Sequence, residues 1–374
     1  MSIPFIDLKA QQARIRDKIE AGINGVLDHG AYIMGSEVGA LETRLGEWAN
    51  AKHSVSCSSG TDALLLALSG LSLQRGQGVI VPAFTFAASC EVMAIMGAVP
   101  VFAEVDAGTF NLDPTKLDQA LQAGRDAGVE VVGVMGVGLF GQPADYEAIV
   151  DFAREHNLWV IDDAAQSFGA SLHGRKVGSL ADVTCTSFFP AKPLGCYGDG
   201  GAVFTDNDEI AEIMRSCRVH GMGKDKYENI RIGMTARLDT MQAVVLDAKL
   251  DIFASELVAR HAAADLYEEL LGSIVEVPHL ASGATSSWAQ YTVKLPKNSD
   301  RGKICQAMQQ DGVPTAIYYP IAMCDQPPYK SYPVAGGHLA VTADLCERVI
   351  ALPMHPYLDE ATQSKVAAAL KAAL

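Results

Sequence analysis

The stretch from Thr184 to Gly201, T-C-T-S-F-F-P-A-K-P-L-G-C-Y-G-D-G-G, holds a single lysine in a constrained setting. Lys192 lies between Pro190 and Pro193, with two phenylalanines before it and a glycine-rich segment after it. An amine in a partly apolar pocket loses hydration that favours its charged form, so its pKa falls and the neutral form can attack a carbonyl. A loop lysine without a role fits this stretch equally well. The choice between a reactive and an ordinary lysine therefore depends on the rest of the sequence.

The length and composition of the chain indicate a packed globular protein. A chain of 374 residues suggests about two domains, and 49% hydrophobic with 20% charged residues is typical of a packed globular protein. The eight cysteines are scattered without C-x-x-C or histidine partners, which favours reduced thiols and predicts no metal site. The N-terminus lacks a basic segment followed by a long apolar run, so we expect a cytoplasmic protein without a membrane span.

The charge balance excludes some partners. A net charge of −15 and a pI near 5.0 argue against binding to nucleic acid or to an anionic membrane surface, since both need clustered Lys and Arg. An anionic small substrate would need a local cationic pocket.

The hydrophobic pattern predicts an α/β fold. Two helices are expected first, at residues 10–29 and after Gly35-Ser36, and short β-like runs then alternate with helical segments. The expected strands are 54–58, 78–81, 99–105, 129–134 and 158–161. Such alternation implies a mostly parallel sheet, which binds ligands at the carboxyl ends of its strands.

The pattern changes near residue 239, where one long helical run extends to about residue 271. The elements expected after it are strands at 290–295 and 315–319 and helices at 302–310, 339–350 and 360–374. We therefore expect a large domain at residues 1–240, and a linking helix with a small α+β domain at residues 241–374.

Two strand ends carry polar residues that suit a ligand. Ser58-Ser59-Gly60-Thr61-Asp62 closes one strand and opens an apolar helix, so its free backbone amides could hold a phosphate or its hydroxyls could merely cap the helix. Asp162 and Asp163 follow the buried run Val160-Ile161. An acid there could pair with a protonated ring nitrogen, hold a metal, or cap a helix. Magnesium is the weaker alternative, because no further carboxylates lie at suitable spacing.

A phosphate site, a strand-end acid and a constrained lysine together match the needs of pyridoxal phosphate. The lysine forms a Schiff base, the phosphate anchors the cofactor, and the acid keeps the pyridine nitrogen protonated. An aromatic ring that covers the cofactor is also needed, and Phe84 and Phe86 follow the strand at 78–81.

At this point the sequence resembles the DegT/DnrJ/EryC1/StrS sugar aminotransferases, which are fold-type I pyridoxal-phosphate enzymes with an aspartate-aminotransferase-like large domain. The resemblance covers nearly the whole chain. Its most specific stretches are S-S-G-T-D-A-L, V-P-A-F-T-F, D-D-A-A-Q-S-F-G-A, S-F-F-P-A-K-P-L-G-C-Y-G-D-G-G, R-L-D-T-M-Q-A and L-P-M-H-P-Y-L.

The resemblance implies a role for individual residues. Lys192 would form the Schiff base and then move the proton during transamination, and Asp163 would face the pyridine nitrogen. Further cofactor contacts are implied for Gly60, Thr61, Phe86, Gln166 and Ser187. The amino donor would be L-glutamate, with pyridoxamine phosphate as the intermediate form of the cofactor.

One departure from the family pattern concerns cofactor binding. Members usually have G-x-N-x-R-L before the long helix, and that asparagine reaches the cofactor phosphate of the other subunit in a homodimer with shared active sites. Here Thr235 takes its place. A threonine hydroxyl is shorter, so the contact is expected to be weaker or bridged by water.

Within the family the sequence is most similar to enzymes that aminate C3 of UDP-2-acetamido-2-deoxy-3-oxo-D-glucuronate. There an arginine at the Arg237 position and a His-Tyr pair meet the sugar carboxylate, and Tyr318-Tyr319 stands at the pair here. Because Tyr318 carries no positive charge, a neutral 3-keto or 4-keto nucleotide sugar remains an alternative. A non-catalytic regulator is another, whereas a sugar dehydratase is disfavoured because those relatives have histidine in place of Lys192.

Overall fold

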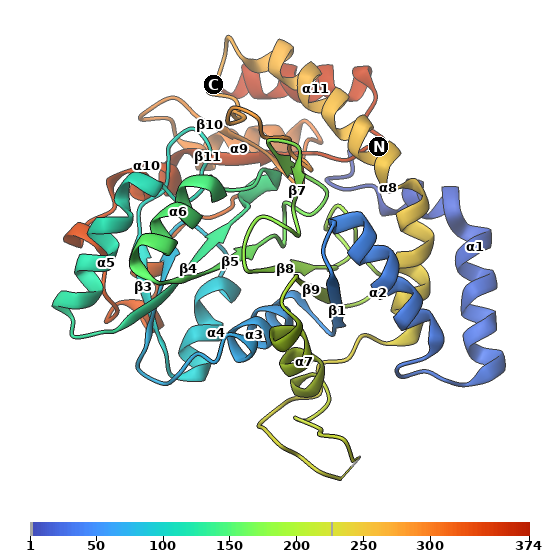
Figure 1. Ribbon diagram of the computed structural model, residues 1–374. Helices are drawn as coiled ribbons and strands as arrows, with labels where there is room; N and C mark the ends of the chain where they lie inside the picture. Colours follow the sequence, from blue (N-terminus) through green and yellow to red (C-terminus); the bar gives the residue numbers. More distant parts are fainter. Residues whose placement is uncertain (1–2, 226) are drawn as a thin grey trace.

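The computed structural model describes residues 3–225 and 227–374, and its centre is a seven-stranded sheet (Figure 1). In spatial order the strands are β1 (His53–Cys57), β9 (Gly201–Thr205), β8 (Val183–Ser187), β5 (Trp159–Asp163), β4 (Val131–Val137), β2 (Gly78–Pro82) and β3 (Val99–Ala103). Strand β9 runs antiparallel to both of its neighbours, and the other neighbouring pairs are parallel. The predicted mostly parallel sheet is confirmed.

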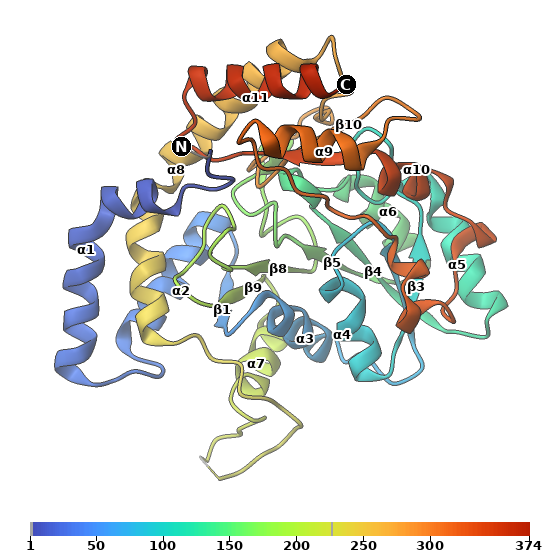
Figure 2. The same ribbon diagram turned by 180° about the vertical axis from the view of Figure 1, so that it is seen from behind.

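Helices cover both faces of this sheet. In Figures 1 and 2, α3, α4 and α7 lie together on one side, and α6 packs on β4 and β5 from the other. The α-helices before the long one are α1 (Leu8–His29), α2 (Ser36–Ala49), α3 (Gly60–Gly70), α4 (Ala88–Met96), α5 (Leu117–Asp126), α6 (Tyr146–His156) and α7 (Asp208–Cys217). A short hairpin is formed by β6 (Ser171–Leu172) and β7 (Arg175–Lys176).

The main core forms because the inner strands are apolar on both sides and α3 is apolar almost all round. Val79, Ile80 and Val81 of β2 are fully buried, as are Leu66 and Leu68 of α3. Burying each such side chain favours folding by about 1.5–3 kcal/mol. This packing fixes the start of α3 beside the strand ends.

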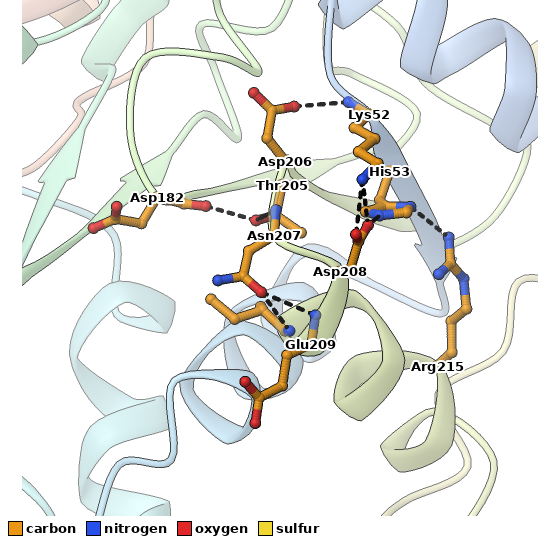
Figure 3. A network of polar contacts seen from close by, with 10 residues as sticks. Lys52, His53, Asp182, Thr205, Asp206, Asn207, Asp208, Glu209 and Arg215 are labelled. Atoms are coloured by element: carbon orange, nitrogen blue, oxygen red, sulfur yellow. Dashed lines mark hydrogen bonds and ion pairs between the residues drawn. The ribbon is translucent and has the colours of Figure 1, made fainter.

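A polar network fixes the outer strand β1 to the start of α7 (Figure 3). The side chain of Asn207 accepts hydrogen bonds from two backbone N–H groups of the first turn of α7, at 2.9 and 3.2 Å. Asp208 contacts Lys52 and His53 at the beginning of β1, at 2.7 and 2.6 Å. The cap explains where α7 begins, whereas the exposed ion pairs add little to stability because water screens them.

A second hydrophobic cluster lies in the C-terminal part, above the sheet in Figure 1. The α-helices and strands of this C-terminal part are α8 (Thr240–Leu271), β10 (Tyr291–Lys294), α9 (Arg301–Gln310), α10 (Ala340–Arg348), β11 (Val349–Leu352) and α11 (Glu360–Ala373). Residues in the range 323–339, however, pack into the main core. The division into 1–240 and 241–374 stays a prediction.

The strand predicted at residues 315–319 is wrong. Only Ala316 pairs there, through a single bridge to Ala351 of β11. Pro314 and Pro320 flank the segment and lack the backbone N–H that a strand pairing needs. The strand β11 instead occupies the end of the helix that had been predicted to reach residue 350.

Candidate active site

A cavity of about 430 Å³ opens where β4, β5 and β8 end, so it lies at the carboxyl edge of the parallel strands. Residues from distant parts of the sequence line it. Those predicted from the sequence are Gly60, Thr61, Phe86, Asp163, Gln166, Ser187, Lys192, Tyr318 and Tyr319. The fold therefore brings these nine residues to one space.

Lys192 lies in a turn that follows β8, and its backbone N–H donates to the carbonyl of Phe189 at 2.8 Å. Its side chain borders the cavity but is otherwise surrounded by protein. Burial lowers the pKa of Lys192, and the nearby carboxyl group of Asp163 partly opposes this effect. A larger fraction of the amine is therefore neutral than in a solvent-exposed lysine.

Asp163 ends β5 and is 5% exposed. Its Oδ2 accepts a hydrogen bond from the Ser89 hydroxyl at 2.7 Å, and its Oδ1 accepts from the backbone N–H of Ala165 at 3.2 Å. Burial raises the pKa of Asp163, although these donors and Lys192 oppose the rise. Thr85 lies 2.9 Å from the Ser89 hydroxyl and fixes its position.

The start of α3 forms a small cradle beside Ser187. The Ser59 hydroxyl caps the helix by accepting the backbone N–H of Asp62 at 3.0 Å. A Cβ atom on Gly60 would come within 2.7 Å of the Ser187 Cβ, so only glycine allows this close approach. The helix N-terminus and the Ser187 hydroxyl thus face the same side of the cavity, which suits an anionic group.

Aromatic and amide side chains form another wall. Gln166 accepts the backbone N–H of Phe140 at 2.6 Å and donates to the Tyr319 hydroxyl at 3.3 Å. Phe86 is 56% exposed, and its ring centroid lies 6.2 Å from that of Tyr319. Tyr318, the next residue along this wall, is half-buried.

Thr235 and Arg237 lie outside the cavity. They belong to the segment between α7 and α8, called the arm below, whose described residues are 218–225 and 227–239 and which projects from the body (Figures 1 and 2). Thr235 is exposed, and its hydroxyl lies 2.8 Å from Nε2 of His220. Arg237 lines a separate hollow of the arm together with Arg231 and His220.

The magnesium alternative does not fit the geometry. Asp162 pairs across β4 and β8 with Gly136 and Thr184 and faces α6, whereas Asp163 faces the cavity. Adjacent residues of a strand point to opposite faces, so the two carboxyl groups cannot share one ion. Across the described residues, no group of three or more His, Cys, Asp or Glu side chains is placed to hold a metal ion.

Sequence reasoning missed several contributors to the site. Ser89, which fixes Asp163, is a small residue in the first turn of α4, and nothing local distinguishes it. Phe189 and Gln290 also line the cavity. Their positions depend on how the turn after β8 and the segment before β10 fold back, which no local pattern reveals.

The fold and this cavity are those of a pyridoxal-phosphate-dependent sugar aminotransferase: an α/β sheet with an amine, a buried carboxyl group and a helix N-terminus at its strand ends. The chain belongs to the DegT/DnrJ/EryC1/StrS aminotransferase family, which it matches over residues 13–371. The activity is therefore that of a nucleotide-sugar aminotransferase.

Two relatives show how far the sequence similarity extends. The chain is 44% identical to the UDP-2-acetamido-2-deoxy-3-oxo-D-glucuronate aminotransferase of Pseudomonas aeruginosa, over 98% of this chain and 99% of the relative. It is 37% identical to a UDP-N-acetyl-3-dehydro-alpha-D-glucosamine 3-aminotransferase of Acidithiobacillus ferrooxidans, over 100% of this chain and 98% of the relative.

Solved structures agree with the fold. An aminotransferase of this family from Brucella abortus superposes with a TM-score of 0.96 at 43% identity, covering 99% of both chains. NtdA from Bacillus subtilis, solved with bound pyridoxamine phosphate, gives a TM-score of 0.90 at 28% identity, covering 100% of this chain and 85% of NtdA. Among residues 3–225 and 227–374, no helix is long and apolar enough to cross a membrane.

Proposed function

We propose that the Lys192 cavity holds pyridoxal phosphate and transfers an amino group from L-glutamate to C3 of UDP-2-acetamido-2-deoxy-3-oxo-D-glucuronate. One observation supports the cofactor position most strongly. The cavity joins a lysine of lowered pKa to a buried carboxyl group and to a cradle that a Cβ atom at Gly60 would fill. When bound, pyridoxal phosphate supplies an electron sink for the carbanion that transamination requires.

Different residues of the cavity would bind different parts of the cofactor. Gly60, Thr61 and Ser187 would bind the phosphate through backbone N–H and hydroxyl groups at the start of α3. Asp163 would pair with the protonated ring nitrogen. Such a pair neutralises a carboxylate that the protein otherwise buries at a cost in free energy.

The remaining contacts would orient the ring. Phe86 would cover one face of it, because its side chain is exposed at the cavity wall. Gln166 would lie near the ring hydroxyl, since it is held from two sides by Phe140 and Tyr319.

Lys192 would act in two ways. Its neutral amine attacks a carbonyl carbon, which a charged ammonium group cannot do. Once it is free again, its Nζ would take a proton from the substrate carbon and deliver it to the adjoining cofactor carbon C4′. A pKa lowered by burial suits both tasks, because the amine then changes its protonation state nearer to neutral pH.

The substrate proposal rests on the 44% identity to the Pseudomonas enzyme and on three side chains. Arg237 would pair with the uronate carboxylate, and Tyr318 and Tyr319 would donate hydrogen bonds to the sugar. Both tyrosines line the cavity, whereas Arg237 lies on the arm of the same chain.

This separation supports a homodimer in which the arm of one subunit completes the cavity of the other. Thr235 and Arg237 would reach the partner's cofactor phosphate and sugar. The arm also exposes large apolar side chains, with Ile232 96% and Ile230 53% exposed, and such groups favour burial against another surface.

The substrate proposal is tested by comparing kcat/KM for the uronate with kcat/KM for the corresponding neutral 3-keto sugar. We expect the uronate to be preferred, and Arg237→Gln to reduce this preference by about tenfold to hundredfold, the usual worth of a charge-assisted hydrogen bond. Tyr318→Phe serves as the control, because it removes a hydrogen-bond donor to the sugar but keeps the positive charge of Arg237. A preference for the neutral sugar that Arg237→Gln leaves unchanged would contradict the proposal.

A neutral 3-keto sugar is the second candidate. It is favoured by the uncharged Tyr318 and by the 37% identity to the Acidithiobacillus enzyme, which is named for a glucosamine sugar without a carboxylate. The same comparison of kcat/KM decides between the two substrates.

A further inference from the structure

A second carboxyl group lies behind Asp163 and has no part in the mechanism above. Asp162 is 0% exposed and belongs to a row that runs across the sheet, with Gly136 of β4 on one side and Thr184 of β8 on the other. This row faces α6, whereas Asp163 faces the cavity. The end of β5 therefore holds two buried carboxyl groups in succession, one on each face of the sheet.

The surroundings of Asp162 are shaped to receive it. Tyr146, the first residue of α6, donates its hydroxyl to Asp162 Oδ1 at 2.7 Å. A Cβ atom on Gly136 would come within 2.8 Å of that hydroxyl, so the missing side chain makes room for it. Thr184 Oγ1 donates a long hydrogen bond of 3.5 Å to Asp162 Oδ2. The same hydroxyl oxygen can instead accept a hydrogen bond from a neutral carboxyl group.

The groups that face the two acids differ in charge. Around Asp162, α6 presents the phenol of Tyr146, β8 presents the hydroxyl of Thr184, and β4 presents no side chain. The charged group nearest in sequence is Asp163, which repels a negative charge on Asp162. Within the part of the chain that the structure describes, no Lys, Arg or His forms an ion pair with Asp162.

Asp163 is better placed to carry the charge. It accepts a backbone N–H and a serine hydroxyl, and the amine of Lys192 is near. Two negative charges at one buried strand end would cost more free energy than one. Burial raises the pKa of Asp162 to about 7, with Asp163 adding to the rise and the Tyr146 hydrogen bond opposing it.

We propose that Asp162 is a positioning residue that stays protonated behind Asp163, so that the strand end carries a single negative charge, located on the carboxylate that faces the cavity. Ionisation of Asp162 would add a repulsive charge and strengthen the hold of Asp163 on a proton. The effect on the cofactor rests on the proposed function, whereas the protonation of Asp162 does not.

The first test uses the cofactor-free protein and Asp162→Asn, which imitates the neutral acid. Because the folded-state pKa of Asp162 is raised, its proton stabilises the folded protein, and this stability is lost as the pH rises towards the folded pKa. We expect the urea midpoint of the wild type to fall relative to the variant from about pH 4 to about pH 7 and to level off above it. A difference in midpoint that does not change with pH would overturn the proposal.

Tyr146→Phe is a second variant that keeps Asp162. Removing the phenol takes away a hydrogen bond that favours the ionised acid, so the levelling-off point should move to higher pH. An unmoved levelling-off point would show that the titrating group is not Asp162. This comparison also decides the question if Asp162→Asn fails to fold.

The second readout is the visible spectrum of the protein loaded with pyridoxal phosphate. We expect a pH-dependent shift near pH 7 in the wild type and its loss in Asp162→Asn, which a merely structural role would not produce. A shift that persists in a folded, loaded variant overturns the coupling between Asp162 and the cofactor. If the wild type itself takes up no cofactor, the proposed function fails, and the urea experiment still tests Asp162.

Discussion

At the scale of single residues, the site depends on ionisable groups that burial has moved from their usual pKa. Lys192 and Asp163 shift in opposite directions for the same reason, since each is less stable in its charged form away from water. Hydrogen bonds from Ser89 and Ala165 limit the shift of Asp163. These hydrogen bonds favour the ionised form of Asp163, which is the form that can pair with a cationic group.

Replacing Lys192 by alanine should abolish amine transfer and the visible band of the loaded protein, because the attacking amine is gone. The free energy of unfolding of the cofactor-free protein should change by only about 1 kcal/mol, since removing a buried amine also removes a desolvation cost. The exposed Lys330 provides the control, Lys330→Ala. Activity that survives in Lys192→Ala would disprove the role of this lysine.

Ser89→Ala should weaken cofactor binding without abolishing it. The Asp163 carboxylate loses one of its hydrogen bonds, and a bond to a charged group is worth about 1.5–3 kcal/mol. Equilibrium titration with pyridoxal phosphate should show a Kd raised by about tenfold or more. Ser69→Ala, whose hydroxyl contacts only a helix carbonyl of α3, is the matched control, and an equal loss in both variants would contradict the prediction.

At the scale of elements, the sequence predicted β4 and β5, two of the three strands that end at the cavity, because each is an apolar run between helices. It predicted α1, α3 and α8 within a few residues. It did not predict β8 and β9, whose residues flank the Lys192 turn, because the run Thr184–Thr186 is polar and its pairing with β5 and β9 is long-range. The strand predicted at residues 315–319 does not form, because Pro314 and Pro320 flank it and only Ala316 pairs, with Ala351.

Residue chemistry was enough to select Lys192, Asp163, Phe86 and the helix start at Gly60-Thr61. The other cavity residues, Gln166, Ser187, Tyr318 and Tyr319, could be selected only through the family resemblance. Their roles stay predictions, since their location alone does not show what they bind. Ser89 and Tyr146 could not be selected, because each contributes through a contact with a residue more than fifteen positions away. Such contacts follow from the packing of α4 and α6 against the sheet.

The N-terminus of α3 offers a test of the cradle. Gly60→Ala should raise the Kd for pyridoxal phosphate, because the added Cβ would come within 2.7 Å of the Ser187 Cβ and push the two walls apart. Gly25→Ala in α1 has open space around its Cβ and should stabilise the protein by about 0.5–1 kcal/mol. Unchanged cofactor affinity in Gly60→Ala would contradict the cradle.

At the scale of the whole molecule, the structure separates the residues of one proposed site. The cavity lies at the strand ends, whereas Arg237 lines a separate hollow of the arm. A single chain therefore lacks part of the substrate contacts that its family resemblance implies. A dimer that exchanges arms would restore them in both subunits and could bury the exposed Ile230 and Ile232 of the arm.

Mixing two variants that are impaired in different ways, with the uronate as substrate, tests this exchange. Lys192→Ala keeps an intact arm, and Arg237→Ala keeps an intact cavity. If the sites are shared, dimers that contain one chain of each kind hold one complete site, so mixed samples should recover roughly a quarter of wild-type activity. Recovery should require subunit exchange. Activity that stays at the level of the separate variants would show that each site is built from one chain.

The most direct test of the central claim is the absorption spectrum of the protein loaded with pyridoxal phosphate, recorded before and after L-glutamate and again after the keto sugar. If Lys192 and its cavity transfer amino groups, glutamate should bleach the visible band, and UDP-2-acetamido-2-deoxy-3-oxo-D-glucuronate should restore it. A band that glutamate leaves unchanged in fully loaded protein would contradict glutamate as the donor. A loaded protein with no visible band at all would contradict the role of Lys192 itself.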